Sequence, residues 1–383
     1  MGQWKKINLE KCIDSVKYPS KIPKKNFLEC GKFPIVSQDK ELISGYWMDE
    51  QDLFIIDKPI IVFGDHTKNI KYIDFNFVIG ADGVKILQPK NFLDPKFLYY
   101  FLLAYPVKSL GYARHYRLLK ETDIIFPELI SEQKRIVEIL DKAFEGIDRA
   151  IGNTEKNLAN ARELFDSYLN NIFIEKGEDW VESTIGKVCT LKSGTTVKKD
   201  LVKDSGEIAY VKVINLTDSQ NKEEITTSSH FLLESDIRKN SIFPVGTTIF
   251  PKRGGAIQTN KKRITSIPIC ADLNIMGVIP SPLVDSKFLY FYFLTVDMKT
   301  LGSGSSVPQI NNYDISPLII PFPQNREKQV EITKTFEALT SETQRLETIY
   351  QQKLQALQEL KQSLLHKAFT RELTNLTVKE VAA

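Results

Sequence analysis

Two stretches of the 383-residue chain concentrate positive charge and contain no acidic residue. Residues 251–263 hold five lysines and arginines, and residues 101–120 hold four together with His115. The Gly254-Gly255 pair would let the backbone approach a phosphate or a base edge closely. Arg253 can donate two hydrogen bonds to a guanine, and amide or hydroxyl side chains such as that of Gln258 can pair with other base edges. These residue types predict contact with DNA.

The candidate contact residues lie in two pairs of loops, one pair in each half of the chain. Loop 64–69 follows an Ile-Val-Phe run, and loop 111–117 precedes a long helical stretch; loops 251–263 and 302–312 take the corresponding places in the second half. Polar loops that differ after similar strands are expected if the two halves of the chain recognise different DNA sequences. Loops without any constraint would diverge as well. The candidates are His66, Lys68, Arg114, His115, Arg117, Lys252, Arg253, Gln258, Asn260, Lys261, Lys262, Arg263 and Gln309.

No catalytic or metal-binding motif accompanies this charge. The chain lacks G-x-G-x-x-G after a strand, H-E-x-x-H, G-x-S-x-G, the P-loop pattern and paired cysteines at zinc spacing. Asp82 and Asp272 follow small residues and are expected to serve in turns or caps. The aromatic runs at 99–100 and 290–292 are interpreted as core packing, since they lie among Phe and Leu at helical spacing. We expect a binding protein without a cofactor or metal of its own.

Composition points to a protein of the cytoplasm. Hydrophobic residues make up 42% and charged residues 26%, and the net charge of +3 gives only weak support for a nucleic-acid partner. The four cysteines are expected to be free thiols in a reducing compartment. The N-terminal residues lack the apolar segment of a signal peptide, and no run of about 18 apolar residues predicts a membrane span.

The two halves of the chain repeat each other. Residues 96–102, Lys-Phe-Leu-Tyr-Tyr-Phe-Leu, return almost letter for letter at 287–294, and further matches occur in the same order along both halves. A repeat this long indicates two copies of a domain, because solenoid units are much shorter. Each copy begins with short β-rich runs separated by Gly, Pro, Asn and Asp, and it contains one short apolar helix, at 96–102 or 287–294. The fold class expected for each is mixed α+β.

A long amphipathic helix follows each globular part. Apolar residues recur at alternating spacings of three and four, which is the pattern of a coiled-coil seam. Each helix should contain roughly 40–45 residues and span about 60–65 Å. Such a helix needs a partner for its apolar stripe, and the other helix is available in the same chain. The residues expected to pair the helices are Val137, Phe144, Ile151, Leu158, Phe165, Leu339, Leu346, Leu357, Leu360 and Leu364.

The order of these elements predicts an architecture. Antiparallel packing of the helices would place the globules at opposite ends of a rod with a pseudo-two-fold axis, which matches the symmetry of inverted DNA half-sites. Parallel packing would instead make a clamp with both globules at one end. The expected parts are a first globular domain at 1–128, a central helix at 129–178, a second domain at 179–322, a C-terminal helix at 323–375 and a tail at 376–383.

The whole chain resembles the specificity subunits of type I restriction–modification systems. The resemblance is carried by Ile-Val-Phe-Gly-Asp-His-Thr-Lys at 61–68, Phe-Val-Ile-Gly-Ala-Asp-Gly at 77–83, and Lys-Phe-Leu-Tyr before a Gly-rich loop. Gly-Ser-Ser-Val-Pro-Gln-Ile-Asn at 304–311, Ile-Pro-Phe-Pro at 320–323 and Glu-Lys-Gln-Val at 327–330 add to it. The first copy has Ala-Arg-His-Tyr-Arg where the second has Ser-Ser-Val-Pro-Gln-Ile-Asn, so loop contacts cannot be transferred between the copies.

This resemblance implies a non-catalytic subunit that binds double-stranded DNA. Each globule would be a target-recognition domain that reads one half of a split, asymmetric site, and the helices would set the gap between the halves. It also implies two methyltransferase subunits docked on the chain, with motor–nuclease subunits in the full complex. S-adenosylmethionine, ATP and Mg²⁺ would belong to those partners. Two other hypotheses remain: an assembly scaffold whose globules bind proteins, and an unrecognised nuclease.

Overall fold

The computed structural model describes residues 3–111, 113–302, 307–370 and 372. The chain divides into two compact units, each of which combines one globular domain with parts of both long helices. Unit 1 comprises the described residues of 1–156 and 350–383, and unit 2 comprises 157–349. The tail expected at 376–383 lies outside the described residues. In the described part of the chain, no helix is both long and apolar enough to cross a membrane.

The first domain is a mixed α+β fold of eleven strands and three short helices among the described residues. Its strands form a two-stranded sheet β1-β11, a sheet in the order β2-β10-β7-β8, and a sheet in the order β3-β9-β4-β5, with β6 paired to β9. The strands are β1 (Trp4–Asn8), β2 (Ile13–Asp14), β3 (Lys21–Ile22), β4 (Phe33–Val36), β5 (Gly45–Trp47), β6 (Leu53–Phe54), β7 (Ile60–Gly64), β8 (Ile70–Ile73), β9 (Phe77–Gly80), β10 (Val84–Pro89) and β11 (Asp123–Pro127). The helices are α1 (Leu9–Cys12), α2 (Pro95–Ala104) and α3 (Tyr116–Lys120).

The second domain repeats this plan. It has a two-stranded sheet β12-β22, a sheet in the order β13-β21-β18-β19-β15, and a sheet in the order β16-β14-β20-β17. The strands are β12 (Trp180–Thr184), β13 (Cys189–Ser193), β14 (Ile208–Val211), β15 (Glu224–Ile225), β16 (Phe231–Leu232), β17 (Ile242–Phe243), β18 (Thr248–Pro251), β19 (Arg263–Thr265), β20 (Ile269–Ala271), β21 (Ile275–Pro280) and β22 (Ile319–Pro323). The short helices are α5 (Ile185–Val188), α6 (Ser286–Thr295), α7 (Met298–Leu301) and α8 (Asn312–Ile315).

Strand pairing confirms that the two halves are copies. The antiparallel order β10-β7-β8 corresponds to β21-β18-β19, and the parallel pair β9·β4 corresponds to β20·β14. Each parallel pair is extended on both sides by an antiparallel strand, β5 and β6 in the first domain and β16 and β17 in the second. The two domains therefore share the topology of these strands, while β3 is an additional strand of the first domain and β15 of the second. The mixed α+β prediction is confirmed.

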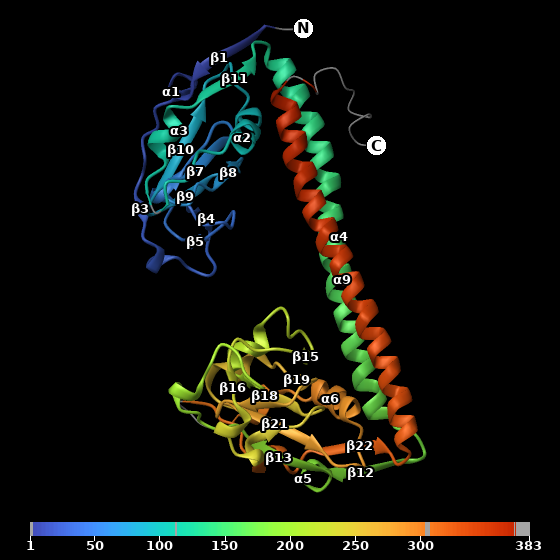
Figure 1. The fold of residues 1–383 in the computed structure, drawn as a ribbon. Coiled ribbons are helices and arrows are strands. Elements are labelled where there is room, and N and C mark those ends of the chain that lie inside the picture. Colours follow the sequence, from blue (N-terminus) through green and yellow to red (C-terminus); the bar gives the residue numbers. More distant parts are fainter. Residues whose placement is uncertain (1–2, 112, 303–306, 371, 373–383) are drawn as a thin grey trace. The chain divides into compact units, whose positions relative to one another are not determined.

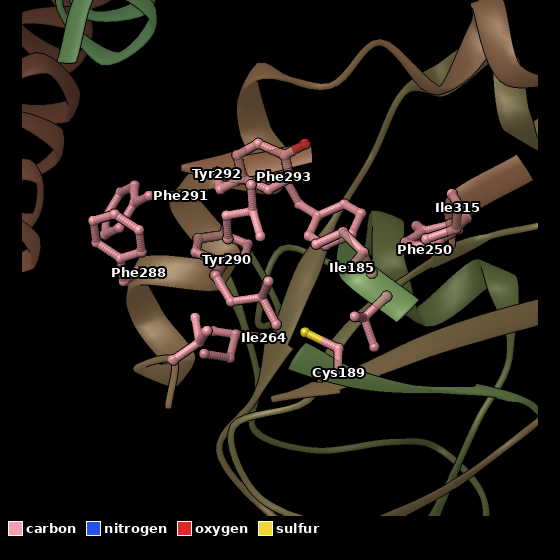
Figure 2. Packing of buried hydrophobic residues seen from close by; sticks show 14 of the residues in the cluster. Ile185, Cys189, Phe250, Ile264, Phe288, Tyr290, Phe291, Tyr292, Phe293 and Ile315 are labelled. Carbon is pink, nitrogen blue, oxygen red and sulfur yellow. The ribbon is translucent and has the colours of Figure 1, made fainter. Parts of the chain in front are cut away.

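The repeated apolar helix lies in the core of each domain. In α6 the residues Phe288, Tyr290 and Phe293 are buried and pack with Phe250 and neighbouring apolar side chains (Figure 2). In α2 the corresponding Phe97 and Phe101 are buried as well. The predicted core role is confirmed for Tyr100 and for Tyr290, Phe291 and Tyr292, which are buried. Tyr99 is partly buried against the same core.

The long helices are α4 (Ile130–Glu175) and α9 (Arg326–Phe369), with 46 and 44 residues (Figure 1). Their ends differ by a few residues from the predicted boundaries. In unit 1 the first part of α4 packs against the last part of α9, as the Asp148–Lys361 ion pair at 2.8 Å shows. In unit 2 the last part of α4 packs against the first part of α9, and Tyr168 meets Phe336 edge-on at 6.3 Å. The helix pairing is antiparallel in each unit.

Several predicted seam residues contact the apolar clusters of the two units: Phe144 is buried, and Val137, Ile151, Phe165, Leu357 and Leu364 are partly buried. In α4 the seam includes the polar Thr154, whose hydroxyl donates to the Ala150 carbonyl at 2.7 Å. In α9 the prediction of Leu360 is wrong, because this side chain is 47% exposed. Leu354 and Lys361 are less exposed than Leu360 and lie on the seam side of the helix instead. An α-helix has 3.6 residues per turn, slightly more than the 3.5 that a seven-residue repeat assumes. Over many turns, the residues that face the partner helix therefore lie at later positions than a strict repeat predicts.

Candidate nucleic-acid interface

In the second domain the two predicted loops are joined into one surface. Arg253 and Gln309 form an isolated antiparallel β-bridge. The amide of Gly254 donates to the Pro308 carbonyl at 2.8 Å, and the amide of Ile310 donates to the Lys252 carbonyl at 2.9 Å. Gly254 has a φ of 69°, a conformation that glycine adopts without strain. The loop after β18 and the segment before α8 therefore present their polar side chains together.

Two cations that are adjacent in sequence, Lys252 and Arg253, lie on this surface. The side chain of Arg253 is exposed, whereas Lys252 is partly buried and its Nζ donates to the hydroxyl of Ser193 at 2.8 Å. Burial and the adjacent Arg253 charge both lower the pKa of Lys252. An anion placed here would relieve the repulsion between the two cations, which is how a phosphate contact gains energy.

Three other candidates hold this loop onto the domain. Lys262 is 2% exposed, and its Nζ donates to the Val296 carbonyl at 2.6 Å and to Asn260 Oδ1 at 2.8 Å. Asn260 Oδ1 also accepts from the amide of Met298. Arg263 donates through Nε to the Asn221 carbonyl at 2.6 Å. Burial lowers the pKa of Lys262 to about 8. These hydrogen bonds give all three side chains structural roles, and the buried Lys262 cannot reach DNA in this conformation.

In the first domain the two loops are also joined, but by a buried side chain. His115 is fully buried; its Nε2 accepts from the amide of Leu110 at 3.0 Å, so Nδ1 carries the proton and donates to the Asp65 carbonyl at 3.1 Å. The Asp65 carboxylate accepts from the amide of Tyr116 at 2.8 Å, and Lys85 lies 3.9 Å from it. The prediction of His115 as a DNA contact is therefore replaced by a role in locking the loops together.

The remaining first-domain candidates are accessible. Arg114 and Arg117 are exposed on either side of the buried His115. His66 and Lys68 are partly exposed in the neighbouring loop, and the amide of His66 donates to Gln38 Oε1 at 3.2 Å. Lys68 has a φ of 62°, which turns the chain sharply after Gly64. The loop pair thus presents cations from two segments that are distant in sequence.

Turns between strands complete both surfaces. In the second domain the amide of Lys252 donates to the Asn274 carbonyl, and Asp272 Oδ1 accepts from the amide of Asn274 at 2.7 Å. In the first domain the amide of Asp65 donates to the Gly83 carbonyl at 2.7 Å. Asp272 is therefore a turn residue, as its sequence context predicted. The β9–β10 and β20–β21 turns occupy equivalent places beside the loops.

Sequence reasoning missed a groove next to Lys252. It has a volume of about 620 Å³ and includes Ser193, the partner of Lys252. Its charged lining residues are Lys192, Lys198, Arg238, Asp200 and Asp236. Lys198 and Arg238 are exposed. These cations are scattered through the sequence, so a search for charge runs could not find them. The fold collects them beside the predicted loop pair.

The remaining second-domain candidates are accessible. Gln258 is exposed, and Lys261 and Gln309 are partly exposed. The side chain of Gln309 donates to Asn311 Oδ1 at 2.6 Å, which fixes its direction. Residues 303–306 of the predicted loop lie outside the described part of the chain.

Comparison with known proteins identifies the family. The model of the type I restriction modification DNA specificity domain matches twice, at residues 1–158 and 177–356. The specificity subunit of the type I restriction enzymes EcoR124I and EcoR124II of Escherichia coli is 23% identical over 357 residues, covering 86% of both chains.

Solved structures show the same fold. A chain from a structural study of complex assembly and conformational transition in the type I R-M system has a TM-score of 0.76 at 16% identity and covers 97% of this chain and 98% of its own. The HsdS subunit from Thermoanaerobacter tengcongensis has a TM-score of 0.52 at 16% identity, with 97% of both chains covered. The double match to the family model spans most of the sequence, and the protein therefore belongs to the type I restriction–modification DNA specificity family.

Proposed function

We propose that this chain is the DNA sequence-recognition subunit of a type I restriction–modification complex. Each domain reads one half of a bipartite, asymmetric site. The observation that carries this proposal is the contrast between the shared topology of the domains and the different chemistry of their loop pairs. An assembly scaffold would need no such paired cationic surfaces, and the family match does not favour it.

The contact residues that we propose are the accessible basic and amide side chains of the joined loops. In the first domain they are His66, Lys68, Arg114 and Arg117; in the second they are Lys252, Arg253, Gln258, Lys261 and Gln309. His115 and Lys262 are left out because they are buried, and Asn260 and Arg263 act through the hydrogen bonds that hold their loop. Arg253 is the strongest candidate for reading a base, because it is exposed at the centre of the joined loops.

The two long helices are proposed to set the gap between the half-sites. They are nearly equal in length, and their apolar seam is occupied by each other in both units. Two methyltransferase subunits would dock on the chain, and motor–nuclease subunits would join them for cleavage. The chain itself is non-catalytic in this proposal and holds no cofactor, and the complex works in the cytoplasm.

A domain exchange tests this assignment. The second domain, residues 179–322, is replaced by that of a family member with a different known target, and methylation is measured with the methyltransferase subunits present. We expect one half of the methylated motif to change and the other half to stay. An unchanged motif would overturn DNA reading by this domain and would support the scaffold. Cleavage of DNA by the purified chain alone would contradict the non-catalytic role.

A further inference from the structure

A buried glutamine joins each recognition domain to the long helix that follows it. In unit 1 this is Gln133, which lies in the first turn of α4 and is fully buried. Its Nε2 donates to the carbonyls of Phe92 at 3.0 Å and Pro127 at 2.8 Å. Its Oε1 accepts from the amide of Asp94 at 2.8 Å. One side chain therefore ties the helix to the loop before α2 and to the end of β11.

The same arrangement occurs in unit 2. Gln329 lies in the first turn of α9 and is also fully buried. Its Nε2 donates to the carbonyls of Leu283 at 3.0 Å and Pro323 at 2.8 Å, and its Oε1 accepts from the amide of Asp285 at 2.7 Å. Every partner of Gln329 is the equivalent of a partner of Gln133. The loops that read DNA differ between the domains, whereas this junction is repeated bond for bond.

Each junction continues into the core helix of its domain. The Asp94 carboxylate caps α2 by accepting from the amides of Lys96 and Phe97, both at 2.9 Å, and Asp285 caps α6 in the same way. Lys96 then pairs with Asp141 of α4 at 2.8 Å, and in unit 2 Lys287 pairs with Glu337 of α9. The glutamine, the cap and the ion pair fix two helices against each other at one angle.

The hydrogen bonds of this junction oppose a change in the angle between the domain and its long helix. Both donors and the acceptor of a buried amide are used, so a change in the angle between domain and helix would leave buried polar groups without partners. Apolar packing alone would tolerate small sliding movements more easily, because it has no directional requirement. The glutamine itself cannot touch DNA, since it is fully buried and all of its hydrogen bonds end within the protein.

We infer that Gln133 and Gln329 are positioning residues that set the gap length which the protein accepts. Each one holds its recognition domain at a fixed angle on its long helix, so that the half-site read by the domain falls at one distance along the DNA. This inference rests on the proposed function, because gap selection has meaning only for a split site. It assigns the precision of the gap to the junctions as well as to the length of the helices.

The test measures methylation of DNA targets whose gap is one or two base pairs shorter or longer than the natural one. Gln133→Met preserves size and burial but removes the three hydrogen bonds. We expect the preference for the natural gap over its neighbours to fall about tenfold, while the bases required in both half-sites stay the same. Gln329→Met should act in the same way through the second domain. The control Gln352→Met changes an exposed glutamine of α9 and should leave the preference intact.

A milder variant keeps the test possible if Gln133→Met or Gln329→Met fails to fold. Asp141→Asn weakens the Lys96 pair at a position about one-third exposed, and we expect a smaller loss of gap preference in the same direction. A merely structural role would lower methylation equally at all gap lengths, in parallel with the melting temperature, and that result would overturn the inference. Failure of the proposed function would look different, because the unmodified protein would then direct methylation to no split motif at all.

Discussion

The two recognition domains are held to their helices alike, but they join their loops differently. Gln133 and Gln329 make equivalent hydrogen bonds, and Asp94 and Asp285 cap equivalent helices. The loop pair of the first domain is locked by the buried His115, whereas that of the second is joined through backbone hydrogen bonds around Arg253. Each loop pair therefore has its own internal connections, while the attachment to the long helix is the same.

The largest effect should come from the scaffold shared by both domains. Phe173 at the end of α4 packs on Phe288 at 5.3 Å, and Phe369 at the end of α9 packs on Phe97 at 5.2 Å. We expect Phe173→Ala and Phe369→Ala to lower the free energy of unfolding by about 3–5 kcal/mol each, because each leaves a large cavity. Denaturant unfolding checks this. A loss in one variant alone would show that the copies are not equivalent.

Removing the buried His115, which joins the two loops of the first domain, should have a smaller effect on stability. Its effect on recognition should be confined to one half-site. His115→Ala removes the hydrogen bonds to Leu110 and Asp65 and should cost about 1–3 kcal/mol. Thermal unfolding measures the loss, and methylation assays should show errors in one half-site only. Arg117→Ala, an exposed neighbour, should leave stability nearly unchanged. Equal stability of the His115→Ala protein and the unmodified protein would rule out the locking role.

A substitution at Arg253 should sharpen the comparison of the loops. If its guanidinium reads a base, Arg253→Ala should reduce the preference for the correct base at one position of the second half-site by about 1–3 kcal/mol. Competition binding with single-base variants of the target measures this. A uniform loss of affinity, with a weaker dependence on salt, would instead make Arg253 a phosphate contact. A change in the first half-site would contradict the assignment of one domain to each half.

The buried Lys262 gives the second domain a pH dependence. Burial lowers its pKa from 10.5 to about 8, so the unfolded chain binds a proton that the folded chain releases between these values. Its contribution to stability therefore rises with pH across this window and is constant below about pH 8. Between pH 8.5 and 9.5 the unfolding free energy of the unmodified protein should gain about 1 kcal/mol relative to Lys262→Met. Parallel pH profiles for the two proteins would contradict the burial effect.

Local patterns in the sequence were enough to predict the elements. The repeated Lys-Phe-Leu-Tyr segments are α2 and α6, and the apolar periodicity gave both long helices, since amphipathic spacing reflects a buried face. The exact seam was harder to predict: the heptad extrapolation failed at Leu360, where the helix had drifted out of register with a strict seven-residue repeat.

The candidate site was only partly predictable, because charge in a sequence does not reveal which partner a side chain will meet. Lys262 looked like Arg253, another cation of the same loop, but in the fold its Nζ donates to the carbonyl of Val296. His115 likewise finds Asp65, fifty residues away. The bridge between Arg253 and Gln309 and the groove with Lys198 and Arg238 arise from strand topology, which no local pattern contains.

Methylome sequencing of cells that carry this chain with its methyltransferase subunits tests the central claim most directly. Two domains of one topology with different loops should yield a split, asymmetric motif with a gap of fixed length. Exchange of loop residues in one domain should alter only the corresponding half. A continuous palindromic motif would contradict the account.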